Sequence, residues 1–286
     1  AEVILLARWM ACDLYLRDID TLRAELSLSR CGDALRAQVG DASREPYRDW
    51  LKQVRGCLQA TQAAALAALG RADAALQSEA GDASAYATGD ELLADMQLCH
   101  DDLQAAGLAL LCEGWLSDNL RRIATFGFDL MRLDIRQEST RHVDALAAIT
   151  KYLGLGDYGA WDEQQRQQFL LQELASPRPL LPLSALSTDV VSGFSDEVRE
   201  VLATFQLLAT QPAEALGAYV ISMAHQPSDV LAVMVLQRKA DSRHPLRVVP
   251  LFETYDDLAR APSCLRSLLA LPIYRECIGN HQEIMI

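Results

Sequence analysis

The residues best suited to chemistry stand at the ends of two short apolar runs in the second half of the chain. In "RLDIRQ", charged and apolar residues alternate, so in a strand Arg132, Asp134 and Arg136 would share one face. In "RVVPLFE", a buried strand would end on Glu253. Guanidinium groups bind phosphate and carboxylate anions, and carboxylates bind hard cations such as Mg²⁺. The two runs therefore raise the hypothesis of an anion site at Arg136 and a cation site at Glu253.

Arg136 has two interpretations that the pattern leaves open. On a strand of a parallel barrel, the apolar face packs against outer helices and the charged face points inward, with the active site at the carboxyl ends of the strands. Because buried charges are costly unless they are paired, Asp134 is expected to pair with one arginine. Arg136, at the carboxyl end, then either completes a structural ion-pair network or remains for an anionic ligand.

The residues around the two later strands also have structural interpretations. Glu253 or Asp256 could cap the helix that follows, in place of a metal-binding role for Glu253. Ser228 is expected to be the N-cap of its helix, whose N-terminus could also receive an anion. His225 is expected to be a surface residue of a loop, and His142 a structural residue of a helix.

The elements that must position these residues are three predicted strands, each followed by a helix. The strand and helix of each pair cover 129–138 and 139–153, 218–224 and 228–240, and 247–253 and 255–269. A fourth strand could begin in "EIMI" at the end of the chain. Strand and helix in repetition are typical of βαβ units and a parallel sheet.

The chain as a whole is expected to be an α-rich α/β protein of two parts. Residues 1–120 form a helical segment, and Asp118 is expected to cap a helix that ends near Gly127. Residues 121–286 form part of a (β/α)8-type barrel. A helical insertion at about 155–215 interrupts it and contains the Pro-rich link "SPRPLLPLS".

Composition and charge exclude several classes of protein. The net charge of −13 argues against a nucleic-acid-binding surface. No apolar run is long enough to span a membrane and the first residues lack the pattern of a secretory leader, so a cytoplasmic protein is expected. The seven cysteines include no C-x-x-C pair, which indicates reduced thiols.

The chain opens inside an amphipathic pattern and closes on an apolar run, as expected of a piece of a longer polypeptide.

Three long stretches resemble the central part of bacterial phosphoenolpyruvate carboxylases. They are "FGFDLMRLDIRQESTRHVDALAAITKYLGLGDYGAW", "AYVISMAHQPSDVLAVMVLQRKA" and "VVPLFETYDDL". In addition, "ARWMACDLYLRDIDTLRAELSLSRC" resembles the helical segment that precedes them in that family. The resemblance covers nearly the whole chain in order and is weakest around residues 70–95.

The resemblance implies the chemistry of a lyase that converts phosphoenolpyruvate and bicarbonate to oxaloacetate and phosphate, with Mg²⁺ or Mn²⁺. It implies that Glu253, in the Phe-Glu-Thr motif, is a metal ligand. It also implies that Arg136, the last arginine of the Arg-x-Asp-Ile-Arg-Gln motif, contacts the substrate phosphate. For the intact enzyme it implies a TIM barrel and an allosteric, cytoplasmic homotetramer that fixes carbon dioxide and supplies the tricarboxylic acid cycle.

Several motifs of that family are not in this sequence. They include Thr-Ala-His-Pro-Thr-Glu, Gly-Asp-Arg-Asp-Gly-Asn-Pro, and Gly-Tyr-Ser-Asp-Ser, which in the family follows the position of Ile286 and carries the second metal ligand. We therefore expect the intact enzyme to be a carboxylase and this chain alone to be inactive. Two alternatives remain: another Mg²⁺-dependent barrel enzyme that uses phosphoenolpyruvate, and a helical scaffold without chemistry of its own.

Overall fold

The computed structural model describes residues 2–71, 82–180, 193–242, 244–279 and 281–286. The chain forms two compact units, Ala1–Met131 and Arg132–Ile286. The division between the units therefore falls after Met131, whereas the sequence pattern predicts a boundary near residue 120. None of the helices in the described residues combines the length and the apolar character that a membrane crossing requires.

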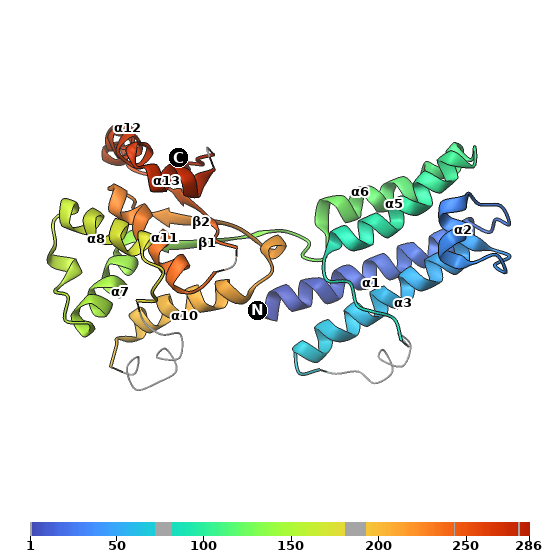
Figure 1. Ribbon diagram of the computed structural model, residues 1–286, viewed down its shortest axis with the longest axis horizontal. Helices are drawn as coiled ribbons and strands as arrows, with labels where there is room; N and C mark the ends of the chain where they lie inside the picture. Colours follow the sequence, from blue (N-terminus) through green and yellow to red (C-terminus); the bar gives the residue numbers. More distant parts are fainter. Residues whose placement is uncertain (1, 72–81, 181–192, 243, 280) are drawn as a thin grey trace. The chain divides into compact units, whose positions relative to one another are not determined.

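The first unit is helical, as the sequence predicts (Figure 1). Its elements are α1 (Glu2–Glu25), α2 (Asp33–Val39), α3 (Pro46–Ala68), α5 (Gly89–Ala105), the 3-10 helix η1 (Ala109–Cys112) and α6 (Trp115–Phe126). α1 packs against α3, and α5 packs against α6. The helical spacing of Trp50, Val54 and Leu58 puts these residues on the face that α3 buries in the core of this unit.

The two ends of α6 compare differently with the prediction. The helix begins at Trp115, directly after Gly114, so Asp118 lies in its first turn and is not the N-cap. A carboxylate in the first turn still favours the helix through its dipole. Gly127 is the C-cap with a φ of 50°, so the predicted end of the helix is confirmed. Glycine adopts this conformation at the least steric cost.

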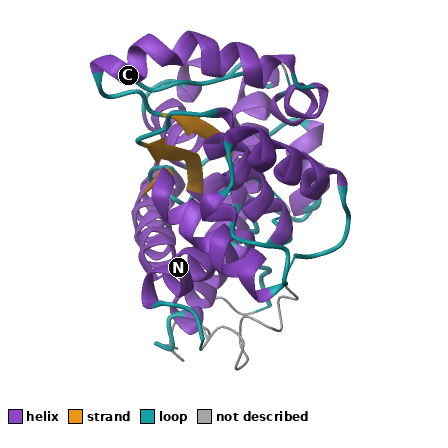
Figure 2. Cartoon of the chain, turned by 90° about the vertical axis from the view of Figure 1, so that its left-hand side faces the viewer, coloured by secondary structure: helices purple, strands orange, loops and turns teal. Residues whose placement is uncertain are grey.

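The second unit contains a parallel three-stranded sheet of order β1-β2-β3, with helices around it (Figure 2). The strands are β1 (Leu133–Glu138), β2 (Leu216–Ser222) and β3 (Arg247–Pro250). The helices that follow them are α7 (Ser139–Tyr152), α11 (Pro227–Lys239) and α12 (Tyr255–Ala270). The predicted repetition of strand and helix and the parallel sheet are confirmed. Within the described residues the three strands form an open sheet.

The last residues of the chain lie beside β3. Met285 forms a parallel bridge with Leu251, directly after the end of the strand. The Phe252 N–H donates to the Met285 carbonyl at 3.0 Å, and the Met285 N–H donates to the Pro250 carbonyl at 3.1 Å. On the other edge, the Leu251 N–H donates to Ile221 of β2. The extended segment predicted in "EIMI" is therefore present as one bridge at the free edge of β3.

The insertion between the first two strands is helical, as predicted. It contains η2 (Tyr158–Ala160), α8 (Glu163–Ala175), α10 (Asp196–Thr210) and η4 (Ala213–Ala215), and the further helix α13 (Pro272–Ile278) follows α12. The predicted Pro-rich link lies only in part within the described residues. α8 is tied to α11 by a buried ion pair in which Lys239 Nζ lies 3.1 Å from Glu173 Oε2.

A buried chain of hydrogen bonds ties α7 to the sheet. The His142 side chain is fully buried, and its Nε2 lies 2.8 Å from the Tyr219 hydroxyl on β2. That hydroxyl donates to Gln137 Oε1 on β1 at 2.7 Å, so His142 Nε2 must be the donor to Tyr219. The other ring nitrogen, Nδ1, is buried without a hydrogen-bond partner among the described residues. The structural role predicted for His142 is confirmed.

This environment predicts that stability depends on pH. Burial, with the nearby charge of Arg141, lowers the pKa of His142 to about 4, from 6.5 for an ordinary histidine. As the pH falls, His142 therefore becomes protonated in the unfolded chain at a higher pH than in the folded chain. The free energy of unfolding falls by about 3 kcal/mol as the pH drops from 6.5 to 4. Urea unfolding of this chain at several values between about pH 4.5 and 7 measures the slope of the free energy of unfolding against pH. His142→Gln, which keeps a neutral donor, is expected to flatten the slope, and an unchanged slope would contradict the assignment.

Candidate functional site

The charged face of β1 forms as the sequence predicts. Along β1 the exposed residues Asp134, Arg136 and Glu138 alternate with half-buried residues. The register places Arg136 in one row with Val220 of β2 and Val249 of β3. Because the residues of one row share a face of a parallel sheet, Arg136 lies on the face opposite to the one that packs against α7 and α10.

Asp134 does not pair with an arginine of its own strand, contrary to the prediction. Its Oδ1 accepts a hydrogen bond from the backbone N–H of Ala218 at 2.8 Å. The pairing of β1 with β2 shifts register between Leu133 and Ile135, which leaves this N–H to a side chain. A Cβ on Gly217 would lie 2.3 Å from Asp134 Oδ1, so the arrangement requires glycine there.

Arg136 and Glu253 both keep their charged groups exposed. Glu253 follows the buried residues Leu251 and Phe252 after the end of β3. Within the described part of the chain, neither charged side chain has a hydrogen bond or an ion pair, so the structural ion-pair network considered for Arg136 is not found there. The two side chains do not contact each other, and none of the described grooves is lined by both.

The capping alternative for Glu253 and Asp256 is wrong, because a different residue caps α12. Thr254 is the N-cap, and its hydroxyl accepts from the Asp257 N–H at 3.2 Å. The Asp257 carboxylate accepts from the Thr254 N–H at 3.0 Å, which completes a capping box. Glu253 stands just outside the helix and is not needed to begin it, so its carboxylate is available to a ligand.

The N-terminus of α11 also differs from the prediction. Gln226 is the N-cap, and Ser228 is the second residue of the helix. The N–H and the hydroxyl of Ser228 both donate to the carboxylate of Glu163 on α8, the N–H at 3.0 Å. The position at this helix end that could receive an anion is therefore held by a carboxylate of the protein itself.

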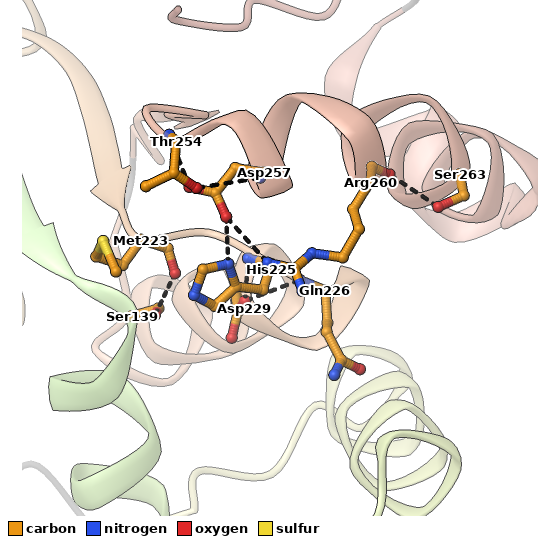
Figure 3. A network of polar contacts seen from close by, with 9 residues as sticks. All are labelled: Ser139, Met223, His225, Gln226, Asp229, Thr254, Asp257, Arg260 and Ser263. Carbon is orange, nitrogen blue, oxygen red and sulfur yellow. Dashed lines mark hydrogen bonds and ion pairs between the residues drawn. The ribbon is translucent and has the colours of Figure 1, made fainter.

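His225 belongs to a polar cluster that the sequence patterns did not predict (Figure 3). Its imidazole is 37% exposed, and Nδ1 lies 2.7 Å from Oδ1 of the fully buried Asp257. Arg260 lies 3.3 Å from the same oxygen. Hydrogen bonds from Thr254 and Arg260, with the imidazole of His225 nearby, lower the pKa of Asp257 well below its ordinary range, although burial opposes the shift. The Thr-x-x-Asp spacing at 254–257 was the available signal, since it is a capping-box pattern.

The described residues include an accessible carboxylate that could bind a divalent cation, but they do not form a complete set of metal ligands. Among the described residues, no three His, Cys, Asp or Glu side chains gather in a way that could hold a metal ion. Mg²⁺ is often bound by only one or two protein carboxylates, with water and substrate oxygens as the remaining ligands. Glu253, exposed and unpaired within the described residues, fits the role of one such ligand.

Known proteins resemble this chain over its full length. The family model for phosphoenolpyruvate carboxylase matches residues 1–286. The chain is 49% identical to the phosphoenolpyruvate carboxylase of Marinobacter nauticus, 52% to that of Ectopseudomonas mendocina and 50% to that of Pseudomonas aeruginosa. Each match covers 100% of this chain, and the chain spans 31% of the length of each relative. The chain therefore belongs to the phosphoenolpyruvate carboxylase family.

Proposed function

We propose that this chain supplies part of the active site of a phosphoenolpyruvate carboxylase. The reaction joins carbon from bicarbonate to phosphoenolpyruvate and gives oxaloacetate and phosphate. The observation that carries the proposal is that Arg136 and Glu253 occupy the positions of two family motifs, and that both are exposed and without a hydrogen bond or ion pair in the described part of the chain.

Arg136 would bind the phosphate of phosphoenolpyruvate. A guanidinium group donates two parallel hydrogen bonds to a phosphate and remains charged at any working pH. Two features support this role. Asp134, two residues before Arg136 on the same face of β1, is engaged by the Ala218 N–H, and Arg136 lies on the face of the sheet that α7 and α10 leave uncovered.

Glu253 would hold Mg²⁺ or Mn²⁺. When bound, the cation neutralises negative charge on the phosphoryl group and on the enolate oxygen. One carboxylate is insufficient, and in the family the second ligand belongs to a motif that follows the position of Ile286. The bridge between Met285 and Leu251 supports this arrangement, because it brings the end of the chain next to the strand that leads to Glu253.

The same proposal extends to the architecture of the intact enzyme. Parallel strands with a helix after each, and an apolar cluster of Ala218, Val220, Val249 and Leu251 on the face away from α7, are what a segment of a (β/α)8 barrel requires. We carry over from the family the expectation of an allosteric, cytoplasmic homotetramer.

The proposal predicts carboxylation that needs no nucleotide. A full-length protein that carries this chain is expected to form oxaloacetate only when phosphoenolpyruvate, bicarbonate and Mg²⁺ or Mn²⁺ are all present, as measured by coupling to malate dehydrogenase. The 286-residue chain alone is expected to be inactive, because it lacks the second metal ligand and the histidine motif. Turnover of the full-length protein that requires a nucleotide, or no turnover at all, would contradict the proposal. Oxaloacetate formation by the chain alone would contradict the need for the missing motifs.

A further inference from the structure

We propose that Asp257 is a positioning residue for metal binding, because it fixes the backbone next to Glu253 and ties it to His225. This inference rests on the proposed function, since it takes Glu253 as a metal ligand. Within the described residues the Glu253 side chain has no hydrogen bond or ion pair to orient it. The connection after β2 and the connection after β3 meet at Asp257, four residues from Glu253 in the chain (Figure 3).

Asp257 makes contacts that a helix cap alone does not require. Its side chain is fully buried. Oδ2 accepts from the Thr254 N–H at 3.0 Å, whereas Oδ1 lies 2.7 Å from His225 Nδ1 and 3.3 Å from Arg260 Nη2. One oxygen therefore serves the cap, and the other joins α12 to a residue of the preceding βα connection. A carboxylate buried in this way depends on such partners, because an unpaired buried charge is costly.

His225 is in turn fixed to the start of α11. The backbone N–H groups of His225 and Gln226 donate to Asp229 Oδ2 at 2.8 and 3.0 Å. Asp229 is itself buried, so this turn is anchored in the interior of the unit. The imidazole then reaches Asp257 on α12. A continuous set of contacts therefore runs from α11 to Thr254, the residue directly after Glu253.

Glu253 lies between two fixed neighbours. On one side, Phe252 is buried and its N–H donates to the Met285 carbonyl at 3.0 Å. On the other side, the N–H of Thr254 is held by Asp257. Loss of the Asp257 contacts would release the backbone on one side of the proposed metal ligand. Outer contacts that orient metal ligands typically change metal affinity by roughly 10–100-fold.

The start of α5 in the first unit gives a contrast. Thr88 is the N-cap of α5, and the carboxylate of Glu91 accepts from the Ala87 N–H at 2.8 Å. Glu91 is exposed, and its side-chain contact within the described residues stays inside its own turn. Glu91 therefore supports a cap only, whereas Asp257 supports a cap and a second connection. Replacement of Glu91 therefore serves as a control for replacement of Asp257.

The test is the affinity for Mn²⁺, measured from the electron paramagnetic resonance signal of the free ion with a full-length carboxylase that carries this chain. Asp257→Asn is expected to raise the Kd for Mn²⁺ about 10-fold while the protein stays folded by circular dichroism. His225→Leu is expected to raise it in the same direction. His225→Asn, which keeps a donor near the Nδ1 position, is expected to restore most of the affinity. Glu91→Gln is expected to leave the Kd unchanged.

Glu253→Gln separates the inference from the proposed function. If Glu253→Gln binds Mn²⁺ as the parent does, the metal-binding role of Glu253 is wrong and the proposed site fails. If Glu253→Gln loses Mn²⁺ but Asp257→Asn and His225→Leu bind it as the parent does, only the positioning role is wrong. If Asp257→Asn does not fold, the two His225 variants decide the question. An equal loss in Glu91→Gln would also overturn the inference, because the effect would then not be specific to this site.

Discussion

Glu253→Gln is expected to lower kcat by about 10³-fold in a full-length carboxylase that carries this chain. The variant keeps the size of the side chain and removes the charge that a hard cation requires. Stabilisation of developing negative charge by a bound metal contributes several kcal/mol, and about 4 kcal/mol corresponds to 10³-fold in rate. α12 is expected to remain intact, because Thr254 and Asp257 form its capping box without Glu253. Initial rates at saturating phosphoenolpyruvate, bicarbonate and Mg²⁺ measure the effect.

Asp256→Asn is the matched control for Glu253→Gln. Asp256 is an exposed carboxylate in the first turn of α12 and takes no part in the capping box. Its replacement removes the same charge from nearly the same place, and kcat is expected to stay close to that of the parent. Similar losses in the two variants would contradict a ligand role for Glu253, because they would reflect the local field alone.

Arg136→Gln is expected to lower kcat/KM for phosphoenolpyruvate by roughly 10²–10³-fold, as removal of one strong donor to a charged oxygen does in other enzymes. Most of the change is expected in KM, because the phosphate is charged in the bound substrate as well as in the transition state. Arg136→Lys keeps the charge but loses the planar pair of donors, so it is expected to fall between the parent and the glutamine variant. Steady-state kinetics over a range of phosphoenolpyruvate concentrations gives both constants.

Arg132→Gln controls for the loss of a positive charge on the same side of the sheet. Arg132 is exposed and directly precedes β1, so it lies at the amino end of the strand, away from the proposed site. Its replacement is expected to change kcat/KM little. Equal losses from Arg132→Gln and Arg136→Gln would indicate a general attraction of the substrate and would contradict a direct phosphate contact at Arg136.

The sequence predicted the strands and helices of the second unit well because its local signals agree with one another. Alternation in β1 is strict, and the exposed and half-buried residues follow it in the structure. Each strand is separated from its helix by few residues, which favours parallel βα units. The capping residues were predicted less well. Ser228 and Asp118 are good cap residues by type, yet both lie inside their helices. A carboxylate such as that of Asp118 is also favourable in a first turn, and Ser228 is bound to Glu163 of α8.

Local sequence patterns could not predict which groups pair with the charged side chains. Asp134 bonds to the Ala218 N–H because of a register shift between β1 and β2, and this shift exists only once the two strands have paired. His225 and Asp257 belong to consecutive βα connections, so they meet only when β2 and β3 lie side by side. In both cases the residue types were visible in the sequence, but the contact depends on tertiary packing.

The sequence could predict the individual residues of the candidate site, but it could not predict whether they line one cleft. The sequence placed Arg136 on the charged face of an alternating strand and Glu253 at the end of an apolar run, and the structure leaves both exposed. Whether the two converge on one ligand depends on the rest of the site, and this chain spans 31% of the length of its relatives. Their convergence stays a prediction that follows from family membership and from the parallel register of the sheet.

The central claim is that Arg136 and Glu253 hold the two ends of one metal-bound, phosphorylated substrate. Anomalous diffraction from crystals of a full-length carboxylase that carries this chain, grown with Mn²⁺ and an unreactive phosphoenolpyruvate analogue, tests it most directly. We expect an Mn²⁺ peak about 2.1 Å from a Glu253 carboxylate oxygen, and an Arg136 guanidinium nitrogen about 2.8 Å from an oxygen of the analogue phosphate. An Mn²⁺ peak on other residues with Glu253 turned away, or a phosphate bound out of reach of Arg136, would contradict the claim.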